Sequence, residues 1–129
     1  MNEIRYLNVD CILRSETSLS GLLEALKDDI FTLWNEPLNH GSFVGFETNL
    51  VNTAGPDEDI AEFLRLFEAN SLIPLLNECQ EKVFDIGFES GDVGDPLDFI
   101  IDSKNLKKIT DLGFTIKMRI YPLPPIEKE

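Results

Sequence analysis

The sequence predicts an α+β fold with two layers, in which helices cover one face of a mostly antiparallel sheet of about six strands. Three observations predict it. The chain has 129 residues, 43% of them hydrophobic, which suits one domain with its own core. Six segments alternate apolar and polar residues, as strands with one buried face do. Four other segments repeat apolar residues at helical spacing, so the predicted order is β-α-β-β-α-α-β-β-α-β.

The first four elements lie between residues 5 and 48. A strand over 5–14 places Leu7, Val9, Cys11 and Leu13 on one face. A helix follows, which Ser18 can cap and which runs to about Lys27 on a stripe of leucines. The segments 30–35 and 42–48 flank a loop with Pro, Asn and Gly, which is typical of an antiparallel pair.

Two helices and two strands are predicted in the middle of the chain. The first helix carries Ile60, Phe63, Leu64 and Phe67 on one stripe, and Ser71 begins a second, short helix. The segments KVFDIGFE, residues 82–89, and LDFIID, residues 97–102, both alternate and are predicted as strands.

A helix and a strand complete the prediction. The helix begins at Ser103 and ends at Gly113, which we expect in a left-handed conformation. The strand FTIKMRIY directs Phe114, Ile116, Met118 and Ile120 inward, and the tail from residue 122 to 129 should be loosely held. We expect these residues to be largely buried: Leu7, Val9, Cys11, Phe84, Ile86, Phe88, Phe99, Ile116 and Met118.

Charge limits the partners that the chain can bind. The 24 acidic and 11 basic residues give a net charge of −13, which disfavours nucleic acid and anionic membranes and favours a basic protein. The start of the chain lacks the pattern of a secretory signal, so we expect a cytoplasmic protein that is a monomer when free. Cys11 and Cys79 both fall on apolar faces and are predicted to be reduced core residues.

The acidic residues concentrate in one part of the sequence. Residues 57–102 hold 13 acids and two bases, a balance of −11, whereas residues 103–129 hold six bases and three acids. The stretch DIGFESGDVGDPLDFIID, residues 85–102, has six carboxylates and no base. Pairing with Lys117 and Arg119 on a neighbouring strand can account for the acids on strands, but not for Asp92 and Asp95 in the loop.

The sequence of this stretch favours a role in binding a partner over metal binding, phosphate binding or catalysis. Glu89, Asp92, Asp95 and Asp98 are three residues apart, unlike the ligands of an EF-hand loop, and the glycines of the stretch lack the lysine of a phosphate-binding loop. His40 is the only histidine and falls in a predicted turn. We therefore expect no cofactor, no metal and no catalytic residues. A metal-assisted hydrolase using the carboxylates of residues 89–98, or a ligand-binding or structural module, is the alternative.

The stretch VFDIGFESGD, followed by an alternating segment, a short helix and LGFTIKMRIYP, resembles small bacterial domains of unknown function, some encoded beside toxin genes. The small, acidic, one-domain chain is also similar to immunity proteins of contact-dependent growth-inhibition systems. This resemblance implies a protein that neutralises a basic toxin domain, often a nuclease, by binding it tightly. No functional residue follows from the resemblance.

The charge distribution supplies the predicted binding residues. Those expected to face a basic partner are Glu89, Asp92, Asp95 and Asp98, with Asp57, Glu58 and Asp59 as a second group. Acids near a helix start also favour the helix dipole, so the second group has a local structural role as well. If the loop is not the interface, the open sheet face around Trp34 and Ile100 is the next candidate.

Overall fold

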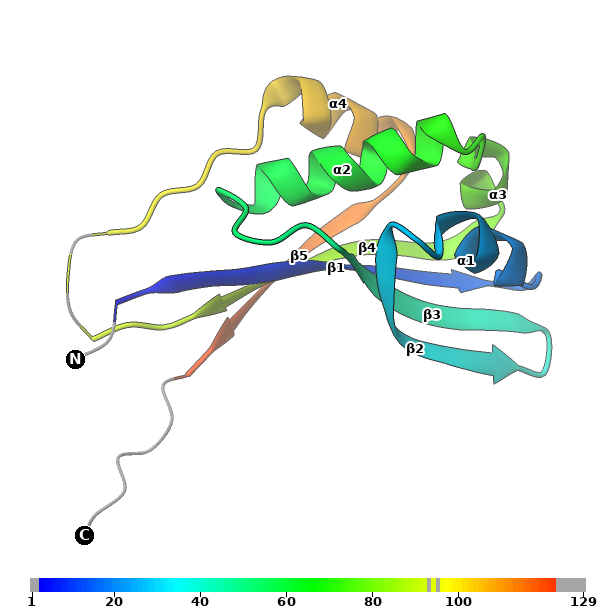
Figure 1. Ribbon diagram of the computed structural model, residues 1–129, viewed down its shortest axis with the longest axis horizontal. Coiled ribbons are helices and arrows are strands. Elements are labelled where there is room, and N and C mark those ends of the chain that lie inside the picture. The colour runs from blue at the N-terminus through cyan, green and yellow to red at the C-terminus, as the bar shows by residue number, and fades with distance from the viewer. Residues whose placement is uncertain (1–2, 93, 95, 123–129) are drawn as a thin grey trace, which may run out of the picture.

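The computed structural model describes residues 3–92, 94 and 96–122, and these residues form one five-stranded sheet and four helices (Figure 1). The predicted α+β class and the mostly antiparallel sheet are confirmed. The elements are β1 (Arg5–Ser15), α1 (Ser20–Leu26), β2 (Ile30–Leu38), β3 (Gly41–Thr48), α2 (Pro56–Ala69), α3 (Ile73–Asn77), β4 (Cys79–Glu89), α4 (Ser103–Asp111) and β5 (Thr115–Tyr121). Of the predicted tail at 122–129, residues 123–129 lie outside the described residues.

The sheet has the strand order β2-β3-β1-β4-β5, with β1 in the centre. β1 is antiparallel to β3 and β4, and β2 is antiparallel to β3. β5 runs parallel to β4, with Phe84 opposite Ile116. A parallel neighbour needs a crossover connection, and α4 provides it.

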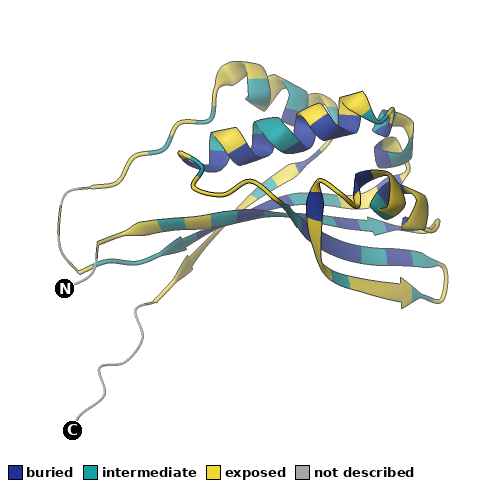
Figure 2. Ribbon diagram, in the orientation of Figure 1, coloured by how far each residue is buried: buried dark blue, intermediate teal, exposed yellow. Residues whose placement is uncertain are grey.

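The helices cover one face of the sheet, as predicted, and the core lies between the two layers (Figures 1 and 2). Phe63 and Phe67 of α2 sit above Phe46 and Phe84 of the sheet, and all four rings are fully buried. Phe84 also stacks on Phe114, with ring centroids 4.2 Å apart. Burying one such side chain contributes about 1.5 to 3 kcal/mol, so this aromatic cluster holds α2 on the sheet.

The predicted strand over residues 97–102 is wrong. This segment is an extended connection that leads to α4 without pairing in the sheet. Its alternation is nevertheless real, because Phe99 packs against Tyr6 and Phe88 at centroid distances of 5.6 and 5.5 Å, whereas Ile100 is 82% exposed. Alternation reports burial on one side and does not require hydrogen bonding to a neighbouring strand.

The predicted burial is confirmed for Val9, Cys11, Phe84 and Ile86. The side chains of Phe88, Phe99 and Ile116 are half-buried. The predicted inward positions of Leu7, Met118 and Ile120 are wrong.

Leu7 is 40% exposed because an irregularity in the β1–β4 register between Tyr6 and Asn8 displaces it from the inner face. Met118 is 67% exposed and Ile120 68%, because β5 is an edge strand and its far half extends beyond the helical layer (Figure 2).

Cys11 and Cys79 are free and buried, as predicted. Burial raises the pKa of both thiols, for Cys11 well above the ordinary value. Both side chains are therefore protonated, weakly polar core residues at neutral pH.

Candidate functional site

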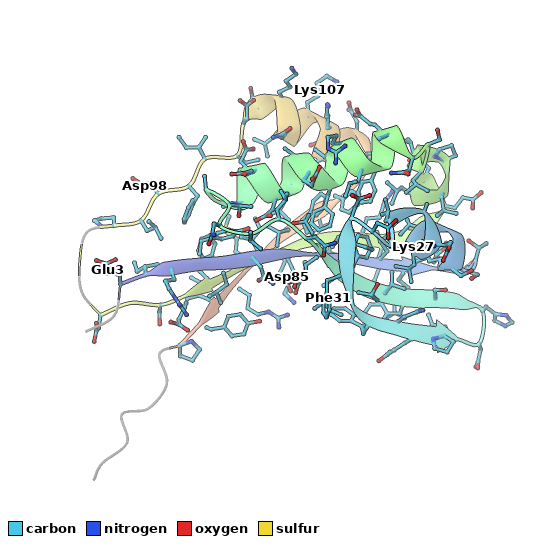
Figure 3. All side chains as sticks on the ribbon, viewed as in Figure 1. Glu3, Lys27, Phe31, Asp85, Asp98 and Lys107 are labelled. Carbon is cyan, nitrogen blue, oxygen red and sulfur yellow. The ribbon has the colours of Figure 1, made fainter. Side chains whose placement is uncertain are left out.

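The predicted acidic stretch divides into carboxylates that are paired within the sheet and carboxylates that lie beyond it. Asp85 of β4 is 8% exposed and pairs with Arg119 of β5 at 3.3 Å. Glu89, at the end of β4, pairs with Arg5 at 3.2 Å. Cross-strand pairing thus accounts for these two acids. Asp98 lies outside the sheet, on the segment leading to α4 (Figure 3).

The structure brings Asp98 together with part of the second predicted group. Asp57, Glu58 and Asp98 line a hollow of about 470 Å³ at the start of α2. The other residues that line this hollow are Ala54, Gly55, Pro56, Phe99 and Ile100. We call it the acidic hollow. Asp98 is 41 residues after Asp57 and 40 after Glu58, and the exposed side chain of Ile100 also lines the hollow.

Hydrogen bonds fix the carboxylates on the α2 side of the acidic hollow. Asp57 Oδ1 accepts the backbone N–H of Asp102 at 3.0 Å and the side-chain amide of Asn105 at 2.9 Å. Glu58 Oε2 accepts the backbone N–H of Ala54 at 2.8 Å. The start of α2 is therefore tied both to the preceding loop and to the start of α4, which positions the segment carrying Asp98.

A close backbone approach completes the acidic hollow. A Cβ atom at Gly55 would lie 2.6 Å from Cδ1 of Phe99, so only glycine fits there without displacement of the ring. Phe99 is held on its other side by Tyr6 and Phe88. The segment 97–101 is thus anchored by an aromatic side chain and presents Asp98 and Ile100 to solvent.

The charge of the acidic hollow is not neutralised within the described part of the chain. No described Lys or Arg forms an ion pair with Asp57, Glu58 or Asp98. The N-terminus of α2 carries partial positive charge, which favours the acids of its first turn. The hollow nevertheless presents net negative charge that a cationic surface can neutralise.

The remaining predicted residues are placed differently. Asp59 is only 6% exposed, so it does not present its charge at the surface as predicted. It points inward because its position on α2 faces the sheet, where three hydroxyl groups donate to it. Asp92 is exposed on the connection after β4, and Asp95 lies outside the described residues.

The alternative interface around Trp34 and Ile100 is not one surface. Trp34 lies over Gly45 of β3, on the sheet face opposite the helices, and next to Phe43 at a centroid distance of 5.6 Å. Ile100 belongs to the acidic hollow. Their predicted proximity depended on a strand at 97–102 that the structure does not have.

Sequence reasoning missed a second group of carboxylates, on the open face of the sheet. Asp10 of β1 lies opposite Asp85 of β4, and the amide of Asn8 donates to both Asp10 and Glu47, at 2.9 and 3.0 Å. Desolvation raises the pKa of Asp10 to about 6, with further contributions from Glu47 and Asp85, while Arg119 opposes the shift. The outward position of Asp10 is visible in the sequence, but the neighbours of β1 are not.

In the described ranges, His, Cys, Asp and Glu side chains form no group of three that could hold a metal ion. His40 lies in the turn between β2 and β3, as predicted. Comparison with protein families, with curated proteins and with solved structures finds no match to this chain. None of the described helices has the length and apolar character needed to cross a membrane.

Proposed function

We propose that this chain is an acidic, non-catalytic binding protein of the immunity type, which neutralises a basic toxin domain by tight association. The observation that carries the proposal is the acidic hollow, which is lined by Asp57, Glu58 and Asp98 together with an apolar side chain, Ile100, that is 82% exposed. The resemblance of the sequence to immunity proteins supplies the toxin class, with a nuclease as the expected activity.

The composition of the acidic hollow supports a protein partner. Stable interfaces combine an apolar centre with a polar rim, and the apolar residues become anchors when water is excluded around them. Ile100 and Phe99 provide apolar surface in the acidic hollow, and three carboxylates line it with them. A surface that binds phosphates is rich in Lys and Arg, so an acidic surface with an apolar centre is complementary to it.

Preorganisation supports tight association. Asp57 and Glu58 already accept hydrogen bonds from the chain, and Phe99 is fixed by two aromatic neighbours. Binding therefore orders few additional side chains, which lowers the entropic cost of association.

The experiment compares association with a copurified basic partner, or with the product of the adjacent gene, by stopped-flow at low and high salt. The test variant combines Asp98→Lys with Glu58→Gln, because glutamine keeps the acceptor for Ala54. We expect association to slow by about tenfold or more at low salt, because the variant loses long-range attraction to the basic partner. Its dependence on salt should also flatten, because salt acts by screening this attraction, over about 8 Å at physiological ionic strength.

The control variant makes the same change in net charge elsewhere. Glu36→Lys with Glu16→Gln changes two exposed acids near the opposite end of β1, where Ser15 pairs with Ser42. Its association rate should stay much closer to that of the wild type. Equal rates and salt slopes for both variants would remove the acidic hollow from the interface.

A further inference from the structure

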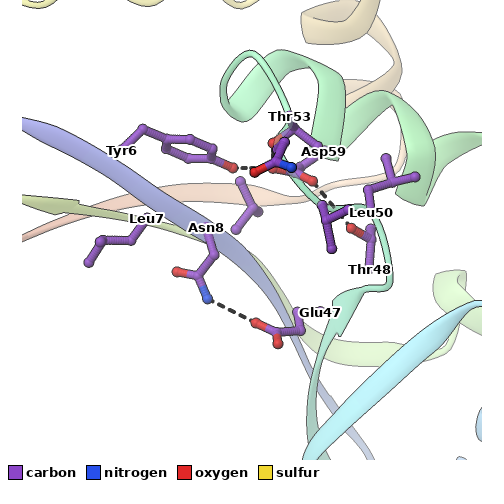
Figure 4. A pocket seen from close by; sticks show the side chains of 11 residues that line it. Tyr6, Leu7, Asn8, Glu47, Thr48, Leu50, Thr53 and Asp59 are labelled. Carbon is purple, nitrogen blue, oxygen red and sulfur yellow. Dashed lines mark hydrogen bonds between the residues drawn. The ribbon is translucent and has the colours of Figure 1, made fainter.

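A cavity of about 470 Å³ opens where β1 and β3 diverge (Figure 4). β3 pairs with β1 only from Ser42, opposite Ser15, to Phe46, opposite Cys11. Beyond Phe46 the chain turns away toward α2, which leaves a gap beside the first half of β1. The cavity is lined by residues 6–9, by residues 47, 48 and 50–53, and by Asp59.

The inner wall of this cavity holds a buried carboxylate with no cationic partner in the described part of the chain. Asp59 is 6% exposed, and its oxygens accept hydroxyl groups from Thr48 at 3.2 Å, Thr53 at 2.9 Å and Tyr6. Removing a charge from water is costly, and hydroxyl groups offset this cost without cancelling the charge. Asp59 therefore leaves a negative potential in the cavity.

Tyr6 remains a neutral donor in this arrangement. Desolvation raises the pKa of its phenol, and the hydrogen bond to Asp59 raises it further. Because the phenol proton is donated to Asp59, the lone pairs of the phenol oxygen are left as acceptors. The same holds for the oxygens of Thr48 and Thr53, so the inner wall offers acceptors to a ligand that carries donors.

A second carboxylate lines the cavity from β3. Glu47 Oε2 accepts the side-chain amide of Asn8 at 3.0 Å, and no described Lys or Arg pairs with it. Two carboxylates, Glu47 from the open-face side and Asp59 from the helix side, thus line one cavity without an ion-pair partner in the described chain. Such a site repels phosphates and carboxylates and attracts a cation.

Three partly exposed apolar side chains also line the cavity. Leu7 is 40% exposed, Leu50 41% and Val51 81%. The loop that carries Leu50 and Val51 continues through Asn52, whose φ of 56° is in the left-handed region that few residues other than glycine adopt. The irregularity in β1 turns Leu7 away from the core, and its side chain lines this cavity instead.

We propose that this cavity binds a small organic cation, in which an ammonium or guanidinium group carried on an alkyl chain lies between Glu47 and Asp59. The charged group donates to the carboxylates and hydroxyl oxygens, and the alkyl part packs against Leu7 and Leu50. The cation can be a free amine or an arginine or lysine side chain of a polypeptide. The site shares no residue with the acidic hollow, so either proposal can fail without the other.

The test is an NMR titration of the isotopically labelled full chain with butylguanidinium at low salt, with butanol as the neutral control. We expect millimolar binding. Shifts should concentrate at Leu7, Val51, Thr53 and the side-chain amide of Asn8, and butanol should not reproduce them. Glu47→Gln keeps the acceptor for Asn8 and should weaken binding by about tenfold or more, because a hydrogen bond to a charged group is lost.

Two further variants keep the result interpretable. Val51→Trp changes an exposed residue at the mouth of the cavity and should block binding without affecting the fold. Glu36→Gln removes one exposed charge away from the cavity and should bind like the wild type. Absence of localised shifts, equal shifts with butanol, or unchanged binding by both Glu47→Gln and Val51→Trp would overturn the proposal.

A last pair of probes distinguishes the two sources of the cation. Butylguanidinium and N-acetyl-arginine amide carry the same guanidinium group and the same single positive charge, but only the second has amide bonds. Tighter binding of butylguanidinium assigns the cavity to a free organic cation, and tighter binding of the arginine amide assigns it to a polypeptide side chain. Equal affinities show that the guanidinium group itself is what the cavity recognises.

Discussion

Asp57 Oδ1 accepts the backbone N–H of Asp102 at 3.0 Å and thereby joins the start of α2 to the start of α4. The same oxygen accepts the amide of Asn105 at 2.9 Å, and Asp102 in turn caps α4 through Lys104. One carboxylate therefore holds two helix ends together. It also fixes one end of the connection that carries Asp98 and Ile100.

Asp57→Ala should lower the free energy of unfolding by about 1 to 2 kcal/mol, because two donors lose their acceptor. The amide of Asp102 should also exchange faster with solvent. Asp57→Asn keeps an acceptor oxygen and should lose less. Urea unfolding and hydrogen exchange measure the two effects. An Asp102 amide that exchanges equally fast in all three proteins would contradict this role of Asp57.

Gly45→Ala should destabilise the fold by about 1 to 3 kcal/mol, because its Cβ would lie 2.4 Å from the ring of Trp34. The fluorescence of Trp34, the only tryptophan, should change as the ring moves. Gly21→Ala is the matched control, because nothing lies within 4 Å of its added Cβ within α1. The Gly21→Ala variant should have a free energy of unfolding about 0.5 to 1 kcal/mol higher than the wild type. Similar effects of both substitutions would argue against close packing of Trp34.

Phe84→Ala should lower the free energy of unfolding by about 3 to 5 kcal/mol, because it removes a fully buried ring that stacks on Phe114. Met118→Ala lies on the next strand and should cost less than about 0.5 kcal/mol, because its side chain is 67% exposed. Chemical denaturation of the two variants compares the inner and outer parts of the sheet. A loss above about 2 kcal/mol for Met118→Ala would contradict the exposure of this side chain on β5.

Asp10→Asn should stabilise the protein at neutral pH. The pKa of Asp10 rises from its ordinary 3.8 to about 6 in the folded state, so ionisation of Asp10 costs stability, and this cost grows as pH increases between those values. Solvent reaches this half-buried carboxylate and reduces the effect. We therefore expect the substitution to increase the free energy of unfolding by roughly 1 to 2 kcal/mol at pH 7.

The measurement for Asp10 is the difference in unfolding free energy between Asp10→Asn and the wild type, from pH 3 to pH 8. The difference should be small below about pH 4 and reach its full value above about pH 6. Glu16→Gln, which removes one exposed charge near the end of β1, controls for the change in net charge. A difference that is independent of pH would contradict the raised pKa.

The sequence by itself determined the fold class and most of the elements. The stripe of Ile60, Phe63, Leu64 and Phe67 predicted α2, and the buried residues of β1 alternate as expected. Gly113 has the predicted left-handed conformation, with φ at 74°. These features are local, because helical and strand periodicities depend on which side of one segment is buried.

Only the tertiary structure decided which segments are neighbours. The alternation at 97–102 comes from packing of Phe99 against Tyr6 and Phe88, and the same pattern would have suited a strand. The acidic hollow depends on Asp98 reaching Asp57, and the cavity depends on β3 leaving β1 after Phe46. Contacts between distant residues follow from how the elements pack together, which the period of a single segment does not encode.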